Sequence, residues 1–559
     1  MMSQRSVIIG LFLWGGLARA GTYYVSPTGS NTGQGTAASP WLTLQYAADH
    51  ASAGDTVNVL AGDYAGFDLR HGGTVTNPLT FLAQPGATID RVIPGGRADG
   101  INIENASYVT VNGFTLLGTG NPATSEAGIR VVGDGFDSPN AFSRGVVVQN
   151  NRVDQWGKWG IFTGFSDDLQ ILNNEASRSA QQHGIYVSNS ADRPIIRGNR
   201  VWGNAAAGIH MNGDIDTGNT ALPGVDGIIS NAVVEKNVIY GNGGGSAYTA
   251  GGGSAINADG VQNSVFRNNL LYDNHATGIA LFQIDGGGPS SGDTVVNNTV
   301  VNAANSRYAL LVANGAVNST LFNNIVYNLN PSLTRGSISL DADALPGFKS
   351  DYNFLDPRFE ASGVPVNSLL LWQTATGGDA HSTAINLAQL KALFKDYANN
   401  DYTLAKTSAA RDAGVASLGG ATAPADDLRG VLRPMGNAYD VGAYEYRLLP
   451  ADANADDTVD VADFRILLAN YGQPGDFAHG DFNHDGRVDF ADFQILERSF
   501  GETQAAGGPL PATPSIVGVP EPTSAAVLAL ALSALPLCSR RRRKNIESTE
   551  LHPTPGRLQ

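Results

Sequence analysis

Cysteine is nearly absent from this sequence of 559 residues, which contains only Cys538. A single cysteine excludes an internal disulfide, so packing and bound metal ions are left to stabilise the folded domains. Charged residues make up only 15% and the formal net charge is −16. Nucleic acid is therefore not expected as a partner, because its phosphates require a basic surface. The 68 glycines indicate a β-rich architecture that turns every few residues.

Apolar runs mark the two ends of the chain. Residues 1–20 combine Arg5, an apolar stretch and Ala18-Arg19-Ala20, which predicts a secretory signal peptide. Near the C-terminus, Val519-Pro-Glu-Pro522 precedes a short apolar run and the basic block 540–544. This order resembles the PEP-CTERM sorting signal of Gram-negative bacteria. The resemblance implies export to the cell envelope or outer surface and processing by an exosortase-type enzyme; a plain membrane anchor is the alternative.

An asparagine motif recurs through the middle of the chain, with consecutive copies 23 to 38 residues apart. Its second asparagines are Asn151, Asn174, Asn199, Asn237, Asn269, Asn298 and Asn324. Asparagine tolerates the left-handed conformation of a tight corner, and stacked asparagines can bond each other along a coil axis. The repeat predicts a solenoid in which each copy forms one coil of three short strands.

A second column of short strands lies out of phase with the asparagines. Gly184-Ile-Tyr-Val187 and Gly208-Ile-His-Met211 are two of its members. Their alternation places the isoleucine inside and the middle residue outside. The N-terminal stretch YYVSPTGS…SPWLTLQYAADHASAGDTVNVLAGDY resembles the start of bacterial right-handed parallel β-helix proteins, including family nine of the polysaccharide lyases. The resemblance implies an all-β, right-handed parallel β-helix solenoid with an N-terminal cap. Residues 440–445 resemble the closing segment of the same class.

Outward-facing residues of stacked strands should form columns, and polar and aromatic residues gather in a few neighbouring coils. The catalytic candidates are His183, His210 and Asp259, and the substrate-binding candidates are Trp159, Tyr186, Asn212, Asn257 and Arg130. Aromatic faces suit sugar rings, while amide and imidazole groups bond their hydroxyls. Glycine-rich insertions at 213–224, 243–253 and 286–291 flank these strands and predict the walls of a groove.

The chemistry that fits this face is cleavage of an acidic polysaccharide by β-elimination. Such a lyase needs a base for the proton beside the uronate carboxylate, and a cation or metal for the carboxylate charge. Either histidine is a candidate base, and Asp214, Asp216 and Asp259 are candidate Ca²⁺ ligands. The lysine and aspartate cluster of lyase family nine is not reproduced, whereas histidine and aspartate on stacked strands resemble alginate epimerases and lyases. A non-catalytic surface glycan-binding or adhesion protein, a glycoside hydrolase and a uronate epimerase stay open as alternatives.

Two acidic loops are copies of one another. Their ligand positions are Asp452, Asn454, Asp456, Thr458, Asp460 and Asp463 in the first loop, and Asp481, Asn483, Asp485, Arg487, Asp489 and Asp492 in the second. The spacing 1, 3, 5, 7, 9 and 12 is that of an EF-hand loop, where position 7 contributes a backbone carbonyl. Each loop leads into an amphipathic helix. The pair resembles a type I dockerin module, which implies two Ca²⁺ sites and a cohesin-like or other surface protein as partner. Asp457, in place of the glycine at position 6, should loosen the first site.

The segments predicted from these signals are 1–20 (signal peptide), 21–99 (cap and first coils), 100–330 (β-helix repeats), 331–447 (closing coils), 452–501 (dockerin-like module), 502–518 (linker), 519–545 (sorting segment) and 546–559 (tail).

Overall fold

A computed structural model of the protein describes residues 20–133, 142–215, 225–447, 449–454, 456–483 and 485–503. The predicted signal peptide up to residue 19, the sorting segment, the tail and most of the linker lie outside the described residues. Among the described residues, no helix is long and apolar enough to cross a membrane.

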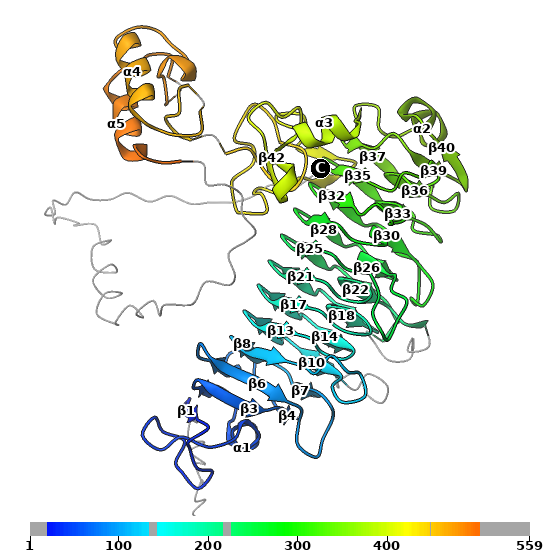
Figure 1. Cartoon of the computed structure of the whole chain (residues 1–559), viewed down its shortest axis with the longest axis vertical. Helices are drawn as coiled ribbons and strands as arrows, with labels where there is room; N and C mark the ends of the chain where they lie inside the picture. The colour runs from blue at the N-terminus through cyan, green and yellow to red at the C-terminus, as the bar shows by residue number, and fades with distance from the viewer. Residues whose placement is uncertain are drawn as a thin grey trace, which may run out of the picture. The chain divides into compact units, whose positions relative to one another are not determined.

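The chain forms a right-handed parallel β-helix, which confirms the predicted fold class. Three long sheets run along its length, and nearly all of their strand pairs are parallel. Each coil contributes one strand to each sheet, so that strands far apart in sequence are stacked as successive rungs (Figure 1). The stack extends beyond the repeats recognised in the sequence, from β1 near the N-terminus to β41.

The first sheet contains β1 (Thr22–Val25), β2 (Thr56–Val59), β5 (Leu79–Ala83), β8 (Val109–Asn112), β12 (Val147–Gln149), β16 (Gln170–Leu172), β20 (Ile195–Arg197), β24 (Val233–Glu235), β28 (Val265–Arg267), β31 (Thr294–Val296), β34 (Thr320–Phe322) and β37 (Lys349–Asp351). The second contains β4 (Phe67–Leu69), β7 (Ile101–Glu104), β10 (Ala127–Val132), β14 (Trp159–Gly164), β18 (Ile185–Ser188), β22 (Ile209–Asn212), β26 (Ser254–Asp259), β30 (Thr277–Phe282), β33 (Leu310–Val312), β36 (Ile338–Leu340), β39 (Phe359–Ala361) and β40 (Val364–Val366). The third contains β3 (Gly62–Ala65), β6 (Ala87–Arg91), β9 (Thr115–Leu117), β13 (Arg152–Asp154), β17 (Glu175–Ser177), β21 (Arg200–Trp202), β25 (Val238–Tyr240), β29 (Leu270–Tyr272), β32 (Thr299–Asn302), β35 (Ile325–Asn328), β38 (Phe354–Leu355) and β41 (Thr383–Ala384).

Shorter strands make four small sheets: β11 (Ser143–Arg144) with β15 (Ser166–Asp167); β19 (Ala191–Asp192), β23 (Ile229–Ser230) and β27 (Val261–Gln262); β42 (Phe394–Asp396) with β43 (Asp401–Leu404); and β44 (Ser417–Leu418) with β45 (Ala421–Thr422). The α-helices are α1 (Leu44–His50), α2 (Leu369–Thr376), α3 (Leu387–Ala392), α4 (Val461–Asn470) and α5 (Phe490–Ser499).

The interior of the coils is a continuous apolar column. Ile161, Ile185 and Ile209 are fully buried on neighbouring strands of the second sheet. Burial of one such side chain stabilises the fold by about 1.5–3 kcal/mol, and the column repeats this contribution in every coil. The predicted inward position of these isoleucines is confirmed.

The asparagines form a hydrogen-bonded ladder at the corner between the first and third sheets. Asn151 Nδ2 donates to Asn174 Oδ1 at 3.0 Å, and the same bond joins each later pair as far as Asn353. The residue before each ladder asparagine takes the left-handed conformation, as at Asn150 and Asn173. The predicted roles of the motif are therefore divided between its two positions: the first turns the corner and the second bonds along the axis.

Both ends of the stack are covered. At the N-terminal end, Trp41 stacks on Tyr23 of β1, with ring centroids 4.6 Å apart. At the other end, Trp372 of α2 is fully buried and stacks on Phe359, at 4.8 Å. Segments between residues 385 and 446 fold back over the outer face of the third sheet and make a second apolar core with it. These segments cover both ends of the stack and the outer face of the third sheet.

The closing segment is anchored by a buried ion pair. Arg433 Nη1 lies 2.9 Å from Glu445 Oε2, and neither side chain is exposed. Arg433 also donates to the carbonyls of Asp440 and Gly442, and the Asn297 amide donates to the same two carbonyls. These bonds fix residues 433–445 on the asparagine corner of the β-helix.

Candidate functional site

The candidate site lies on the outer face of the second sheet, where the predicted columns are confirmed. Phe162, Tyr186 and His210 pair in register across β14, β18 and β22. Asn257 continues this column on β26. Two residues further along the same strands, Asn212 is aligned with Asp259 in a second column. Because parallel strands lie about 4.8 Å apart, neighbouring members of a column touch.

Aromatic rings cover the coils just before the histidines. Trp159 stacks on Phe162 with centroids 4.6 Å apart, and Phe162 lies 5.4 Å from Tyr186. Trp159 Nε1 donates to Gln182 Oε1 at 2.7 Å, which fixes the indole. Gln182 was not identified from the sequence, since no motif signals a residue that orients a ring one coil away. The partly exposed rings form an apolar floor beside polar groups.

His183 and His210 form a direct hydrogen bond, with His210 Nδ1 3.0 Å from His183 Nε2. The backbone N–H of Ala207 donates to His183 Nδ1 at 3.2 Å. On the other side, His210 Nε2 lies 3.3 Å from the amide nitrogen of Asn257. The two histidines therefore belong to one network that begins at a backbone amide and ends at the accessible face.

The Ala207 N–H gives this network one direction. Because His183 Nδ1 accepts that hydrogen, the proton of neutral His183 is on Nε2 and is donated to His210 Nδ1. His210 then carries its own proton on Nε2, which faces the site. The Asn257 amide, turned about its terminal bond, presents its oxygen as an acceptor for this N–H. The geometry does not support the expectation that His183 is the base, because both of its ring nitrogens are engaged inside the network.

Burial keeps the histidines neutral and the tyrosine protonated. Burial lowers the pKa of His210 to about 4, against an opposing effect of an Asn212 hydrogen bond, Asp259 and Asp285. Burial and the neighbouring His210 lower the pKa of His183 as well. Burial raises the pKa of Tyr186 to about 12, although its own hydrogen bond to Asn212 acts the other way. A neutral imidazole and a phenol therefore lie side by side, with ring centroids 4.8 Å apart.

Asp259 is held by a loop instead of pointing freely into the site. Its carboxylate accepts the backbone N–H groups of Ile284, Asp285 and Gly286 at 2.8 to 3.0 Å, and it is 4% exposed. Three donors suit a carboxylate that fixes a loop and not one that transfers protons. These bonds connect Asp259 to the loop at 284–286, and its catalytic role stays a prediction. The donors come from 25 or more residues further along the chain, so the strand pattern carried no signal for them.

The described parts of the glycine-rich insertions meet beside Asp259. Ile215 N–H donates to the carbonyl of Asp285, and Gly287 N–H donates to that of Gly227. A Cβ at Gly286 would lie 2.4 Å from the Cα of Gly260, so the backbones touch. Residues 216–224, including the candidate calcium ligand Asp216, lie outside the described residues. The contacts support the prediction that these insertions wall the face.

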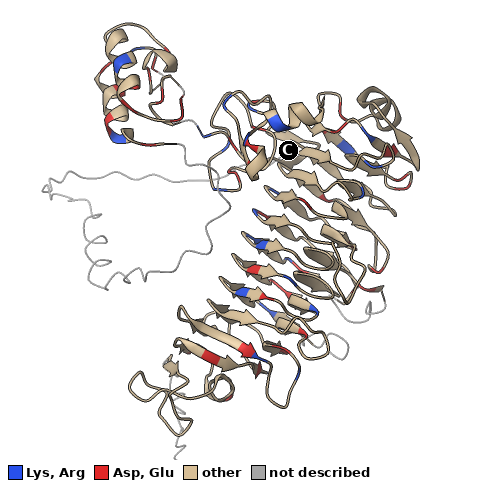
Figure 2. Ribbon diagram, in the orientation of Figure 1, with Lys and Arg blue, Asp and Glu red and all other residues tan. Residues whose placement is uncertain are grey.

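Arg130 is part of a chain of charged groups two coils before Tyr186. Its guanidinium donates to Asn102 Oδ1 at 2.7 Å and lies 3.5 Å from Glu104. Lys158 contacts Glu126 at 2.5 Å and lies over the Trp159 ring. Figure 2 shows acidic and basic residues intermixed along the coils. Arg130 therefore lies at the edge of the candidate site.

The two acidic loops have the same internal hydrogen bonds. Asp463 accepts the N–H groups of Asn454 and Asp460, and Asp492 accepts those of Asn483 and Asp489. Asp460 and Asp489 cap α4 and α5. Asp452 accepts two backbone N–H groups, as does Asp481 in the second loop. Across the described residues, no set of three or more His, Cys, Asp or Glu side chains is arranged to hold a metal ion. Calcium binding in the loops and in the groove stays a prediction, supported in the loops by the oxygen donors and their duplication.

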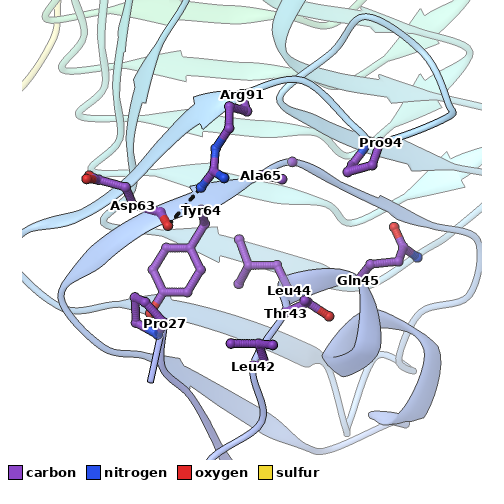
Figure 3. A pocket seen from close by; sticks show the side chains of 11 residues that line it. Pro27, Leu42, Thr43, Leu44, Gln45, Asp63, Tyr64, Ala65, Arg91 and Pro94 are labelled. Carbon is purple, nitrogen blue, oxygen red and sulfur yellow. Dashed lines mark hydrogen bonds between the residues drawn. The ribbon is translucent and has the colours of Figure 1, made fainter. Parts of the chain in front are cut away.

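A pocket of about 330 Å³ opens between the N-terminal cap and the first coils, lined in part by Leu42, Leu44 and Tyr64 (Figure 3). Its polar groups are engaged. The Tyr64 hydroxyl donates to two backbone carbonyls, the Gln45 amide bonds the backbone of Asp68, and Arg91 donates to the Asp63 carbonyl at 3.0 Å. This concavity is a seam between the cap helix and the coils.

Comparisons with known proteins place the similarity in the coils. A family model described as periplasmic copper-binding protein (NosD) matches residues 87–271. An uncharacterized protein, YwoF of Bacillus subtilis (strain 168), is 28% identical over 342 residues, covering 57% of this chain and 71% of that protein. Pectate lyase PEL9 of Emericella nidulans is 24% identical over 215 residues, covering 34% of this chain and half of the lyase.

Solved structures share the architecture. A rhamnogalacturonan lyase aligns with a TM-score of 0.45 and 17% identity, covering 60% of this chain and 87% of the lyase. Pectate lyase Pel9A aligns with a TM-score of 0.42 and 15% identity, covering 77% of this chain and 98% of the lyase. At these identities the likeness concerns the fold.

Proposed function

We propose that the protein is an exported polysaccharide-active β-helix enzyme that cleaves an acidic glycan by β-elimination. The observation that carries the proposal is the cluster of His210, Tyr186 and two asparagines beside an aromatic floor. Pectate lyase PEL9, which is similar over 215 residues, is a lyase of an acidic polysaccharide by its name. The cluster offers neutral donors for a carboxylate and a phenol for proton transfer.

His210 acts as a hydrogen-bond donor in this scheme. A neutral imidazole can polarise a carboxylate or carbonyl through its N–H. With its proton on Nε2, His210 would exchange the Asn257 oxygen for the uronate carboxylate when the substrate binds, and the NH2 group of Asn257 or Asn212, both less than 10% exposed, would donate to the same carboxylate. Binding the carboxylate in this way makes the adjacent C5 proton more acidic. This role replaces the expected one of His210 as base.

Tyr186 is the group that would move the proton. As a phenolate it takes the C5 proton, the electrons of the C–H bond form the C4–C5 double bond, and the C4–O4 bond breaks. The departing oxygen takes the proton from the Tyr186 hydroxyl, which restores the phenolate. Because the pKa of Tyr186 is raised to about 12, the rate should rise with pH across the neutral and alkaline range.

Hydrogen bonds and solvent reduce the repulsion that the carboxylates near the site exert on an acidic ligand. Asp259 is engaged by three backbone N–H groups, and Asp214 accepts from Asn189 Nδ2 at 3.2 Å. Asp285 is exposed, where salt screens its charge. A hydrolase would need two free carboxylates, and the engagement of Asp259 makes that alternative weaker.

The test is incubation of the purified protein with pectate and alginate, with Ca²⁺ or with a chelator. Unsaturated product, detected by its ultraviolet absorbance, is the expected result, and Tyr186→Phe should abolish it. A uronate epimerase would instead change the sugar composition of alginate without unsaturated product, which NMR detects. Binding of the polymer without either change would favour the non-catalytic glycan-binding alternative, for which the partly exposed Trp159 and Phe162 rings are the supporting feature.

We further propose that the two acidic loops bind Ca²⁺ and that this module docks the enzyme to a cohesin-like or other surface protein. The duplicated oxygen donors support the metal, because Ca²⁺ prefers oxygen ligands. The predicted signal peptide and sorting segment support export and exosortase-type processing. Calorimetric titration of the chain with Ca²⁺ tests the metal sites, and cell fractionation with and without residues 519–545 tests sorting.

A further inference from the structure

A second pocket, of about 230 Å³, lies on a different sheet from the histidine cluster. One wall is Tyr272 of β29 in the third sheet, and the other is the C-terminal segment that carries Tyr397, Asn400 and Tyr402. Tyr402 lies 5.3 Å from Tyr272 and 5.7 Å from Tyr397, measured between ring centroids. Three aromatic rings from two segments far apart in sequence thus enclose one concavity.

The polar atoms of this pocket lack protein partners. Within the described part of the chain, the hydroxyls of Tyr272, Tyr397 and Tyr402 make no hydrogen bond, and the Asp273 carboxylate makes none either. Tyr402 is only 4% exposed, yet its hydroxyl is not among the fully buried side-chain atoms without a partner, so the hydroxyl is accessible from the pocket. Burial raises the pKa of Tyr272 to about 12, so that its hydroxyl keeps its proton and can donate. The three tyrosine hydroxyls and the Asp273 carboxylate could hydrogen-bond a ligand that has several hydroxyls.

The neighbouring tyrosine differs in this respect. Tyr240, stacked on Tyr272 at 4.9 Å, accepts a hydrogen bond from Arg200 Nη2 at 2.5 Å. The stack therefore continues as a structural ladder away from the pocket, with its rings covering one another. The three tyrosines of the pocket lie where the C-terminal segment meets the third sheet.

We propose that this pocket binds one neutral pyranose unit. A sugar is recognised by aromatic rings, which pack on its apolar face, and by hydroxyl, carboxylate and amide groups, which bond its hydroxyls. Sites for drug-sized ligands have volumes of about 300–1,000 Å³. The volume of this pocket is smaller, which suits a single sugar ring. Asp273 is the only charged side chain that lines it, so a uronate would be repelled. Lys391 contacts the outer side of the Tyr397 ring and does not line the pocket.

Such a site would hold a neutral sugar of the polymer, or of a branch on it, while the second sheet engages another stretch. It does not depend on the proposed reaction. Two sites on one rigid β-helix raise the effective concentration of each segment for the other site.

The test is saturation-transfer NMR on the full chain with the methyl glycosides of glucose, galactose, mannose and xylose, and with galacturonate for comparison. We expect saturation of at least one neutral glycoside at this pocket, whereas any saturation of galacturonate should come from the second sheet and should not change in variants of the pocket. Tyr402→Phe and Tyr397→Phe keep the rings and remove only the hydroxyls, and each should weaken binding about tenfold or more. Tyr240→Phe, whose hydroxyl is already bonded, should bind as the wild type does.

Groove variants separate this proposal from the proposed reaction. Tyr186→Phe should leave glycoside binding unchanged while it abolishes cleavage. Absence of binding for all four neutral glycosides at about 10 mM would overturn the pyranose proposal. So would equal binding by the wild type and the two hydroxyl-less variants, or binding of galacturonate that these variants abolish.

Discussion

Replacing Asn237 with alanine should cost a large part of the stability of the β-helix. The Asn237 amide donates to the Ile196 carbonyl at 2.9 Å and to Asn269 Oδ1 at 3.0 Å. Its oxygen accepts from the backbone N–H and from the amide of Asn199, at 2.9 and 3.0 Å. The side chain is not exposed, so water cannot replace these bonds.

The magnitude follows from the groups left unpaired. Alanine leaves the Asn199 N–H and one hydrogen of the Asn199 amide without partners, and it removes the side-chain donor of the Ile196 carbonyl, which is paired in the β20–β24 ladder. Asn269 Oδ1 keeps the Asn237 backbone N–H. Each unpaired buried group costs about 1–3 kcal/mol, and the values do not add fully. We expect a loss of about 3–5 kcal/mol in the free energy of unfolding.

The assay is urea unfolding followed by tryptophan fluorescence, or the unfolding rate where refolding is incomplete. The matched control is Asn305→Ala, because Asn305 is exposed and its side chain bonds only His275 Nδ1, at 2.8 Å, within the described residues. The control should lose less than about 1 kcal/mol. If Asn237→Ala lost no more than Asn305→Ala, the ladder would not be a stabilising element of the coils.

Four further outcomes follow. The pKa of His210 falls from 6.5 in the unfolded chain to about 4 in the fold, so neutral His210 stabilises the protein above pH 6.5. This contribution of up to about 3 kcal/mol is lost as the pH falls towards 4. Acid unfolding checks this, because the stability of His210→Gln should depend less on pH than that of the wild type. The rate of cleavage should rise from pH 7 to pH 9 if Tyr186 is the base, whereas a pH-independent rate above pH 5 would return the role to His210. Nitrogen NMR should find His210 protonated on Nε2 alone, and His183→Phe should remove that preference; an Nδ1-protonated His210 in the wild type would refute the hydrogen-bond direction. Asp492→Ala should remove one of two Ca²⁺ equivalents in a calorimetric titration. Asp476→Ala is the control and should bind both equivalents, because its exposed carboxylate bonds His479 outside the loops. Two equivalents retained in Asp492→Ala would contradict the ligand assignment.

The parts of the fold that repeat could be predicted from the sequence. The asparagine spacing and the Gly-Ile-x-Val strands are local patterns, and stacking in register then places Phe162, Tyr186, His210 and Asn257 in one column. The N-terminal segment 21–99, expected to hold the cap, contains the helix α1 from Leu44 to His50. Repetition is informative here because each coil must present the same faces to its neighbours.

What could not be predicted depends on contacts between distant segments. The direction of the His183–His210 bond is decided by the backbone N–H of Ala207, which has no side-chain signature. The position of Asp259 depends on the loop at 284–286. The return of the C-terminal segment over the third sheet, anchored by Arg433 and Glu445, follows no repeat at all. The individual chemical roles in the site therefore had to come from the three-dimensional arrangement.

The central claim is that Tyr186, beside a carboxylate-binding His210, moves the proton in β-elimination of an acidic glycan. The most direct measurement compares wild type and Tyr186→Phe on pectate and alginate at pH 9, by ultraviolet absorbance of the unsaturated product, after circular dichroism has shown both proteins to be folded. The account predicts product from at least one polymer with the wild type, and a rate lower by about a thousandfold or more in the variant. Equal rates in the two proteins, or no unsaturated product from any uronate polymer, would contradict it.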